Sequence, residues 1–385
     1  MSCSYSDICG GCTYRDLPTD EYQRLKVGQF RNALQLITRQ DFQISSPIFI
    51  KDGIRRRAKF SFKRLKSRVI FGFNAMASHE IIDIDTCPLL SKKINENLYF
   101  IRSLLEKITS FEIQIRKAKS FIKRKIESGD VWITEADNGL DVVLEFDAAL
   151  DLRIREIIFS ELTAKDDIIR ISHRLKSNLS PEVIMEKAKP CIKIAGYDVF
   201  IPAGTFLQPS KAGEQTLIEL TESFLAGISG KIADLFCGVG TFSYALAKDI
   251  KRKIIAVDSS CELLTGFRES LNRQMIGNVK IENRNLFKYP LKGKELYDFA
   301  AIVFDPPRSG AKEQVKEIAA LDDEHKPHVI VAISCNPHTF ARDADILIAG
   351  GYELKEVRMV DQFIYSNHCE LVAGFIKRSD LINKD

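Results

Sequence analysis

Residues 232–241 read Ile-Ala-Asp-Leu-Phe-Cys-Gly-Val-Gly-Thr, an apolar run of strand length that passes directly into a glycine-rich turn. A segment of helical period follows, from Thr241 to Lys248. Glycine lets the backbone approach a ligand closely, and a strand, glycine turn and helix in this order are typical of nucleotide-binding α/β domains. A bare G-x-G is also compatible with a dinucleotide site or with a packed turn.

Three more apolar runs of the same kind follow the first, with helical segments such as Glu262 to Met275 between them. Strands buried on both faces have this composition, and parallel strands need crossovers of this length. We therefore predict an α/β fold with a doubly wound parallel sheet. The runs are Ile254 to Asp258, Ala301 to Asp305 and Val329 to Ile333.

Acidic residues stand at or near the ends of these predicted strands, at the sheet edge where such folds bind ligands. Asp258 is placed to accept hydrogen bonds from ribose hydroxyls. The third glycine of the dinucleotide fingerprint is replaced by Ser243. The acid Asp234 before the turn, together with Asp258, favours S-adenosylmethionine over a nicotinamide cofactor.

The composition is that of an ordinary folded protein. The chain has 385 residues, 45% of them apolar and 28% charged, with 56 Lys+Arg against 52 Asp+Glu and a net charge of +4. These values exclude a fibrous or globally disordered chain. No apolar run is long enough to span a membrane and the N-terminus has no hydrophobic signal core, so we expect a cytoplasmic location.

The basic residues are concentrated in the first half of the chain, which reads as small α+β units. One run extends from Lys51 to Arg68 and a second from Arg116 to Lys125, both interleaved with phenylalanines. This pattern fits basic faces of folded strands, which either are simply solvated or contact phosphate.

Local patterns in this half predict two elements. Thr19 is expected to cap a helix over Tyr22 to Leu36, and Asn138-Gly139 is expected to turn a hairpin between two strand patterns. Glycines and prolines between Pro181 and Pro209 indicate a transition to a second domain.

Three further motifs follow strand patterns or begin one. Asp305-Pro306-Pro307-Arg308 would hold its two charged residues rigidly at the sheet edge. Cys335, in Ser334-Cys335-Asn336-Pro337, is either a small buried side chain or a nucleophile that attacks an electrophilic carbon as a thiolate. Glu370, in His368-Cys369-Glu370, precedes the apolar run from Leu371 to Ile376 and alone would be assigned to the surface.

Together these segments resemble the RNA (uracil-5-)-methyltransferase family. The resemblance is carried by DLFCGVGTF, DPPRSG, SCNP with TFARD after it, and DQF…NHCE, and is most specific from Phe206 to Phe375. It implies a C-terminal class I (Rossmann-like) S-adenosylmethionine-dependent methyltransferase domain with an N-terminal α+β iron–sulfur and RNA-binding region. The implied domains are residues 1–90 with the cluster and basic region, 91–200 as a central α+β RNA-binding domain, and 201–385 as the catalytic domain.

The resemblance assigns roles to individual residues. Cys335 corresponds to the nucleophile that adds to C6 of uracil, and Glu370 to the general base that removes the C5 proton. Asp305 and Arg308 are expected to help hold the ring. The implied contacts to S-adenosyl-L-methionine are Gln208, Phe236, Thr241, Asp258, Asn285 and Asp305, of which Thr241, Asp258 and Asn285 differ from the residue that is usual in the family.

Four cysteines, Cys3, Cys9, Cys12 and Cys87, resemble the [4Fe-4S] ligand set of the iron–sulfur branch of this family. From the residues alone, structural zinc fits four thiolates at least as well. The family resemblance favours the iron–sulfur cluster.

The expected substrate is a uridine splayed out from RNA, with 23S rRNA favoured and tRNA as the alternative. We expect a monomer without an N-terminal TRAM domain and with no DNA or membrane partner. An RNA cytosine-5-methyltransferase is disfavoured because the segment from Asp305 to Arg308 contains no cysteine. A non-catalytic iron–sulfur RNA-binding or redox-sensing protein is the rival from another class, and it would need neither Cys335 nor Glu370.

Overall fold

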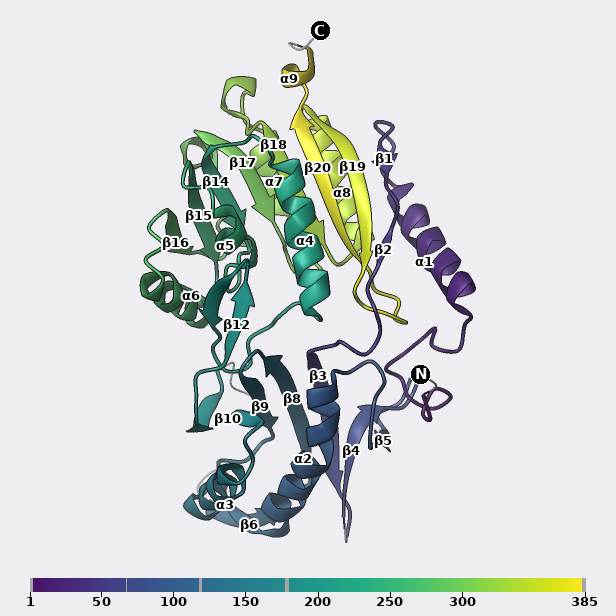
Figure 1. Ribbon diagram of the computed structural model, residues 1–385, viewed down its shortest axis with the longest axis vertical. Helices are drawn as coiled ribbons and strands as arrows, with labels where there is room; N and C mark the ends of the chain where they lie inside the picture. The colour runs from purple at the N-terminus through teal and green to yellow at the C-terminus, as the bar shows by residue number, and fades with distance from the viewer. Residues whose placement is uncertain (1–2, 67, 118–119, 177–179, 383–385) are drawn as a thin grey trace. The chain divides into compact units, whose positions relative to one another are not determined.

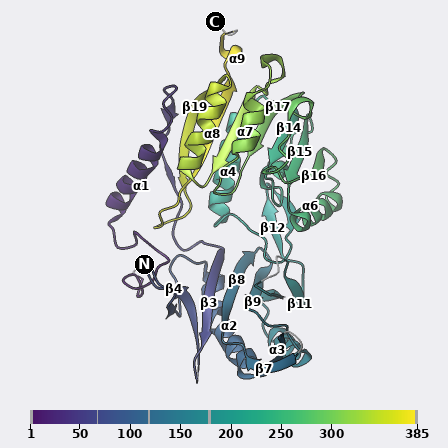
Figure 2. The ribbon, with the colours of Figure 1, turned by 180° about the vertical axis from the view of Figure 1, so that it is seen from behind.

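The computed structural model describes residues 3–66, 68–117, 120–176 and 180–382. Contacts within the chain divide it into two compact units, which we call unit 1 and unit 2. Figures 1 and 2 show the elements of both from opposite sides. Each unit has its own hydrophobic core. Unit 1 comprises Met1–Asp16, Lys51–Ile192 and Phe200–Lys211, and unit 2 comprises Leu17–Ile50, Lys193–Val199 and Ala212–Asp385.

Unit 2 is built on a sheet with the strand order β1-β19-β20-β18-β17-β14-β15-β16, and β2 also pairs with β19. The strands from β14 to β18 run parallel, as their continuous apolar runs predicted, whereas β20 lies antiparallel between β18 and β19. Their bounds are β1 (Gln43–Ile44), β2 (Ile48–Phe49), β14 (Gly230–Leu235), β15 (Arg252–Asp258), β16 (Val279–Asn283), β17 (Phe299–Phe304), β18 (Val329–Ser334), β19 (Tyr352–Asp361) and β20 (Glu370–Lys377).

Helices cover both faces of this sheet: α4 lies over one face, and α7 and α8 lie over the other (Figures 1 and 2). Every residue of β18 is buried as a result, which explains the unbroken apolar run from Val329 to Ile333. The helices of unit 2 are α1 (Thr19–Leu34), α4 (Lys211–Phe224), α5 (Thr241–Leu246), α6 (Cys261–Arg273), α7 (Lys312–Ala319), α8 (Pro337–Ala349) and α9 (Ser379–Ile382), with short 3-10 turns at Gly293–Glu295 and Asp323–His325.

Helix α1 packs against α8, although the two helices are far apart in the sequence. The prediction that Thr19 caps this helix is wrong, because Thr19 is its first residue and Pro18 precedes it at the cap position. Proline has no side-chain oxygen to accept a hydrogen bond there. The helix also ends at Leu34, two residues before the predicted Leu36.

Unit 1 contains a second sheet with the order β11-β10-β9-β8-β3-β4-β5. The predicted hairpin is confirmed, since β8 and β9 pair antiparallel and the last pair joins Ala136 to Gly139 across the turn. The elements are β3 (Arg57–Arg64), β4 (Val69–Asn74), β5 (Ile81–Asp83), α2 (Lys92–Ser110), β8 (Ser128–Ala136), β9 (Gly139–Glu145), α3 (Leu152–Thr163), β10 (Ile168–Arg174) and β11 (Glu182–Glu186). Two separate hairpins are formed by β6 (Glu112–Lys117) with β7 (Ser120–Lys125), and by β12 (Cys191–Ile194) with β13 (Tyr197–Phe200).

Alternate residues of β3 face opposite sides of this sheet. Phe60 and Phe62 are buried in the core that includes residues of α2 and α3, while Arg57 and Lys59 alternate with them. The part of the first basic run that lies in β3 is thus a strand face, as predicted, whereas the run begins before this strand and ends after it. The second run includes Arg116 and Phe121, whose side chains lie outside the described residues. No helix in the described part of the chain has the length and apolar character needed to cross a membrane.

Candidate active site

The glycine-rich turn leads from β14 into α5, and its backbone adopts left-handed dihedral angles. Gly238 and Gly240 have φ angles of 55° and 91°, and Phe236 has the positive value of 60°. A Cβ atom on Gly240 would lie 2.4 Å from the ring of Phe267, so glycine is required there for close packing. A Cβ atom on Gly238 would meet nothing within 4 Å, so this side of the turn is open to a ligand.

Asp258 ends β15 beside this turn. Its Oδ2 accepts a hydrogen bond from the Gly238 N–H at 3.0 Å, and its Oδ1 accepts one from the Ser260 N–H at 2.8 Å. Each carboxylate oxygen has a second lone pair, so the bonds to the backbone leave capacity for a ribose hydroxyl. The side chain therefore orders the turn and keeps lone pairs for a further donor.

Asp234, the acid before the turn, is completely buried and accepts a hydrogen bond from Ser243 Oγ at 2.5 Å. Burial raises its pKa to about 7. Ser243 stands where the dinucleotide fingerprint has its third glycine. Its hydrogen bond to Asp234 links the start of α5 to the end of β14.

The other cofactor candidates occupy different places. Thr241 is the first residue of α5, and Asn285 Oδ1 accepts hydrogen bonds from the backbone N–H groups of Phe287 and Lys288. The ring of Phe287 lies 5.3 Å from that of Phe236. Asn285 also lines an open hollow of about 750 Å³ bounded by Ser259, Asn283, Arg284, Lys288, Tyr289, Pro290, Lys292, Glu295 and Glu317.

Gln208 belongs to a different part of the structure. It lies in the segment Phe200–Lys211 of unit 1, where it is buried and its carbonyl oxygen accepts a hydrogen bond from Arg56 Nε at 3.0 Å. The other predicted cofactor and catalytic residues all lie in unit 2.

Cys335 and Glu370 meet at the same end of two neighbouring strands. Cys335 directly follows β18, and Glu370 is the first residue of the antiparallel β20. Ser334 pairs with Leu371, so the next residue on one strand lies at the level of the preceding residue on the other. The two residues are far apart in the sequence, and they become neighbours because β20 pairs antiparallel with β18.

Glu370 is buried, which corrects its assignment to the surface from its motif alone, whereas Cys335 is half-buried. The two groups affect each other electrostatically. The pKa of the Cys335 thiol is raised to about 12, first by burial and then by the charges of Glu370 and Asp305, whereas Arg308 lowers it. The pKa of Glu370 is raised well above its usual value by burial and by Asp305, against a lowering effect of the hydrogen bond from Gln362 Nε2 to Glu370 Oε2 at 3.0 Å. The Cys335 thiol therefore holds its proton at neutral pH in the free protein.

Asp305 and Arg308 lie at the same edge. Asp305 follows β17, and burial together with the charge of Asp234 raises its pKa to about 7. The carbonyl oxygen of Arg308 accepts hydrogen bonds from Asn336 Nδ2 at 3.2 Å and Thr339 Oγ1 at 3.1 Å. The segment after β17 is thus fastened to the segment that carries Cys335.

His368 is a member of this site to which the sequence assigned no role. Its Nε2 lies 2.9 Å from an Nη of Arg308, and burial, Arg308 and Lys26 lower its pKa. The neutral imidazole then accepts a hydrogen bond from the guanidinium. Its position two residues before Glu370 was the available signal, since alternate residues of an extended segment point to the same side.

The four N-terminal cysteines lie near one another in unit 1. The charge of Cys3 raises the pKa of Cys9, Cys12 and Cys87, and Cys87 also raises that of Cys12, although burial is the largest cause for each of the three. Among the described residues, no three metal-binding side chains are arranged to hold a single metal ion. In a [4Fe-4S] cluster each thiolate binds a different iron atom, so its ligands lie farther apart than those of one zinc ion.

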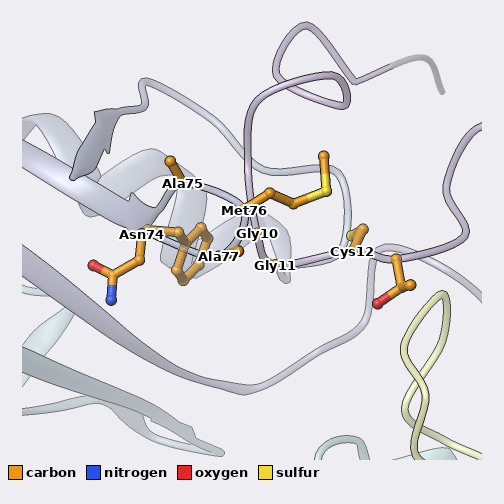
Figure 3. A pocket seen from close by; sticks show the side chains of 9 residues that line it. Gly10, Gly11, Cys12, Asn74, Ala75, Met76 and Ala77 are labelled. Carbon is orange, nitrogen blue, oxygen red and sulfur yellow. The ribbon is translucent and has the colours of Figure 1, made fainter. Parts of the chain in front are cut away.

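Backbone N–H groups point at two of these sulfurs. Gly11 donates to Cys9 Sγ at 3.4 Å, and the N–H groups of Leu89 and Leu90 lower the pKa of Cys87 by hydrogen bonding. Figure 3 shows the adjoining hollow of about 430 Å³, where Gly10 and Gly11 run beside residues 74–77 and Cys12 lies at one side. Four thiols with N–H donors form a donor set that fits an iron–sulfur cluster.

The parallel sheet, the glycine-rich turn and the polar edge define the fold of S-adenosylmethionine-dependent methyltransferases. A crystal structure of Pyrococcus abyssi tRNA (uracil-54, C5)-methyltransferase in complex with S-adenosyl-L-homocysteine has this fold. It matches with a TM-score of 0.71 over 95% of this chain and 86% of that chain, at 23% identity.

The family follows from the sequence comparison. The tRNA (uracil-5-)-methyltransferase family matches residues 25–378, and the chain belongs to it. An uncharacterized RNA methyltransferase of Brucella melitensis is 35% identical over 98% of this chain and 84% of its own length. The 23S rRNA (uracil(1939)-C(5))-methyltransferase RlmD of Aliivibrio salmonicida is 26% identical over 97% of this chain and 81% of its own length. The protein is therefore an RNA methyltransferase.

Proposed function

We propose that the protein methylates C5 of a uridine in RNA, with S-adenosylmethionine as the methyl donor and Cys335 as a covalent nucleophile. The observation that carries this proposal is the convergence of Cys335, Glu370 and Asp305 at the edge of one sheet in unit 2. Binding alone would not require a half-buried thiol beside the buried carboxyl group of Glu370, whose desolvation is costly. Covalent catalysis uses such a set.

The reaction begins at the thiol. Cys335 loses its proton, for which Asp305 is a suitable acceptor because its pKa is about 7, and Arg308 favours the thiolate by its charge. The sulfur then forms a bond to C6 of the uracil, and the electrons of the C5–C6 double bond move to give an enolate. C5 of the enolate is nucleophilic, whereas C5 of the free uracil ring is a poor nucleophile.

S-adenosylmethionine, when bound, supplies the methyl group that C5 takes up. Glu370, as the carboxylate, then removes the C5 proton, the double bond forms again, and the sulfur of Cys335 leaves. Burial makes this carboxylate a strong base once it is ionised, because its pKa lies well above the usual value. Gln362 holds the carboxyl oxygen in place through their hydrogen bond.

The cofactor contacts follow from the turn after β14. We assign the ribose to Asp258 and the adenine to the region of Phe236 and Asn285, and open space at Gly238 supports this placement. Thr241, Gln208 and Asp305 are the remaining proposed contacts.

Unit 1 offers a surface for RNA. The ring of Trp132 on β8 lies under three cations, with Arg57 and Lys59 at 5.1 Å and Arg174 at 5.7 Å from its centre. Arg57 also lies 4.8 Å from the ring of the exposed Phe206, and in the described part of the chain no carboxylate pairs with it. An unpaired guanidinium between aromatic rings suits a phosphate and a stacked base.

The favoured substrate is 23S rRNA, and tRNA is the alternative. The similarity to the Aliivibrio enzyme and the four cysteines support the first, while the fold of the Pyrococcus enzyme is compatible with either. We propose a cytoplasmic monomer without a DNA partner. Mapping of 5-methyluridine in rRNA and tRNA from a strain that lacks the protein identifies the substrate.

We further propose that Cys3, Cys9, Cys12 and Cys87 hold a [4Fe-4S] cluster. The support is their mutual electrostatic influence and the N–H donors directed at Cys9 and Cys87. The cluster would join the N-terminal segment to the segment after β5, which are distant in sequence.

The function is tested with Cys335→Ala and the control Cys191→Ala, which changes a half-buried cysteine of unit 1. We expect Cys335→Ala to bind S-adenosylmethionine but to transfer no methyl group to RNA, measured as 5-methyluridine by mass spectrometry. The control should retain activity. Methyl transfer by Cys335→Ala at more than background would eliminate the covalent mechanism.

A further inference from the structure

The loop between β19 and β20, residues 362–369, carries His368 and leads directly into Glu370. Its internal hydrogen bonds are short-range: Ser366 N–H and Oγ both donate to Phe363 O, at 3.1 Å and 2.7 Å, and His368 N–H donates to Ser366 Oγ. Tyr365 within the loop has a φ of 58°, which is unfavourable for a residue with a side chain. Such a conformation persists only when surrounding structure imposes it.

Lys26 of α1 provides part of that surrounding structure. Its side chain is 2% exposed, and its ammonium group donates to the carbonyl oxygens of Ser366, at 2.9 Å, and of His368. The third contact is an ion pair with Asp361 Oδ1 at 3.1 Å, whose angles fall outside those of a hydrogen bond. Two of the N–H donors of the ammonium group are therefore bound to carbonyl oxygens of the loop, and its charge is paired with Asp361 at the start of the loop.

Tyr22, one helical turn before Lys26, contacts the same loop. Its hydroxyl accepts a hydrogen bond from the Tyr365 N–H at 2.9 Å and donates to Asp361 Oδ2. The rings of Tyr22 and Tyr365 lie 5.0 Å apart. Residues four apart lie on one face of a helix, so a single face of α1 holds the loop at both ends.

We propose that Tyr22 and Lys26 are positioning residues that set Glu370 for the removal of the C5 proton. This inference rests on the proposed function. Lys26 donates a hydrogen bond to the carbonyl oxygen of His368, and only Cys369 lies between His368 and Glu370. This hydrogen bond therefore limits where the carboxyl group of Glu370 can lie. Neither Tyr22 nor Lys26 touches the reacting atoms; they act through the loop.

The test compares Lys26→Met, Tyr22→Phe and the control Arg31→Met, which changes an exposed cation of α1. Small displacements of a catalytic group lower rates by up to about 100-fold. We therefore expect kcat to fall by about 10- to 100-fold in Lys26→Met and by less in Tyr22→Phe, with unchanged affinity for S-adenosylmethionine and RNA. Because attack by Cys335 precedes proton removal, the covalent protein–RNA adduct should accumulate in both variants and not in the control.

The buried carboxylate of Asp361 is left without its cation in Lys26→Met, so this variant could fail to fold. The double variant Lys26→Met/Asp361→Asn removes both charges and restores neutrality while still leaving the loop carbonyls without their donor. It should fold and still accumulate the adduct. A folded variant with the kcat of the unmodified enzyme, or a slow one without adduct, overturns the inference. Failure of the unmodified enzyme to form 5-methyluridine in the same assay would instead reject the proposed function.

Discussion

The substitution Glu370→Gln isolates one chemical property of the site. Glutamine has the size of glutamate, and its carbonyl oxygen can accept the hydrogen bond that Gln362 donates at 3.0 Å. The substitution removes only the ability to take up a proton. Burial and Asp305 raise the pKa of Glu370 above its usual value, whereas the amide of the variant does not titrate.

The effect on folding stability follows from the same shift. The unfolded chain releases the proton of this carboxyl near its ordinary pKa, whereas the folded chain keeps it. The stability of the unmodified enzyme therefore falls as pH rises from the unfolded to the folded pKa, and that of the Glu370→Gln variant does not. We expect the variant to be at least as stable as the unmodified enzyme at pH 7.

The kinetic effect is larger. A positioned general base contributes about 10²- to 10⁴-fold, which corresponds to about 3–5 kcal/mol of activation free energy. Attack by Cys335 and methyl transfer come before proton removal and remain possible in Glu370→Gln. The variant should therefore accumulate a covalent adduct that already carries the methyl group.

The assay mixes Glu370→Gln with RNA and S-adenosylmethionine and separates the products under denaturing conditions. A protein band of reduced mobility should appear, and mass spectrometry should find the mass of the methylated nucleotide on the Cys335 peptide. Glu324→Gln, an exposed position, serves as the control and should turn over normally. Normal turnover of Glu370→Gln without adduct would refute the role of Glu370 as the base.

Three further predictions concern stability and the cluster. Asp234→Asn should stabilise the protein by up to about 4 kcal/mol at pH 8 and little at pH 4. The reason is that folding raises the pKa of the buried Asp234 carboxyl from 3.8 to about 7, so the stability of the unmodified protein falls as pH rises through this window. Urea unfolding of the two proteins with no pH-dependent difference would contradict this. Gly240→Ala should cost about 2–5 kcal/mol, since the positive φ and the ring of Phe267 both oppose a Cβ, whereas Gly277→Ala, with free space around it, should cost much less in thermal unfolding. Anaerobic purification should give a brown protein with iron and sulfide, and Cys12→Ser should lose the colour; a colourless protein with zinc would exclude the cluster.

Much of unit 2 could be predicted because its signals are local. The four apolar runs and the glycine-rich turn predicted the parallel strands and the start of α5, and each depends on residues that are adjacent in the chain. The Asn138-Gly139 turn predicted its hairpin for the same reason. One error lay at a helix end, Thr19, where one cap residue decides the boundary. Another was Glu370, which its motif alone assigns to the surface and which is buried.

The organisation of the chain into units depends on distant contacts. We predicted three consecutive domains, which remain a hypothesis about function, whereas contacts group the chain into two units whose segments alternate along the sequence. Residues 17–50 belong with the C-terminal sheet because β1 and β2 pair with β19 and α1 packs on α8. No local pattern in α1 indicates which distant element it will contact.

The sequence by itself determined which chemical groups are present and where strands and turns follow one another along the chain, since backbone preference and apolar periodicity act over a few residues. It also carried the family resemblance through its motifs. Only the tertiary structure decided that Cys335 and Glu370 are neighbours and that His368 contacts Arg308. It also decided that Lys26 binds the loop between β19 and β20. The physical reason is that burial, and with it the pKa of each group, depends on packing between segments far apart in the chain.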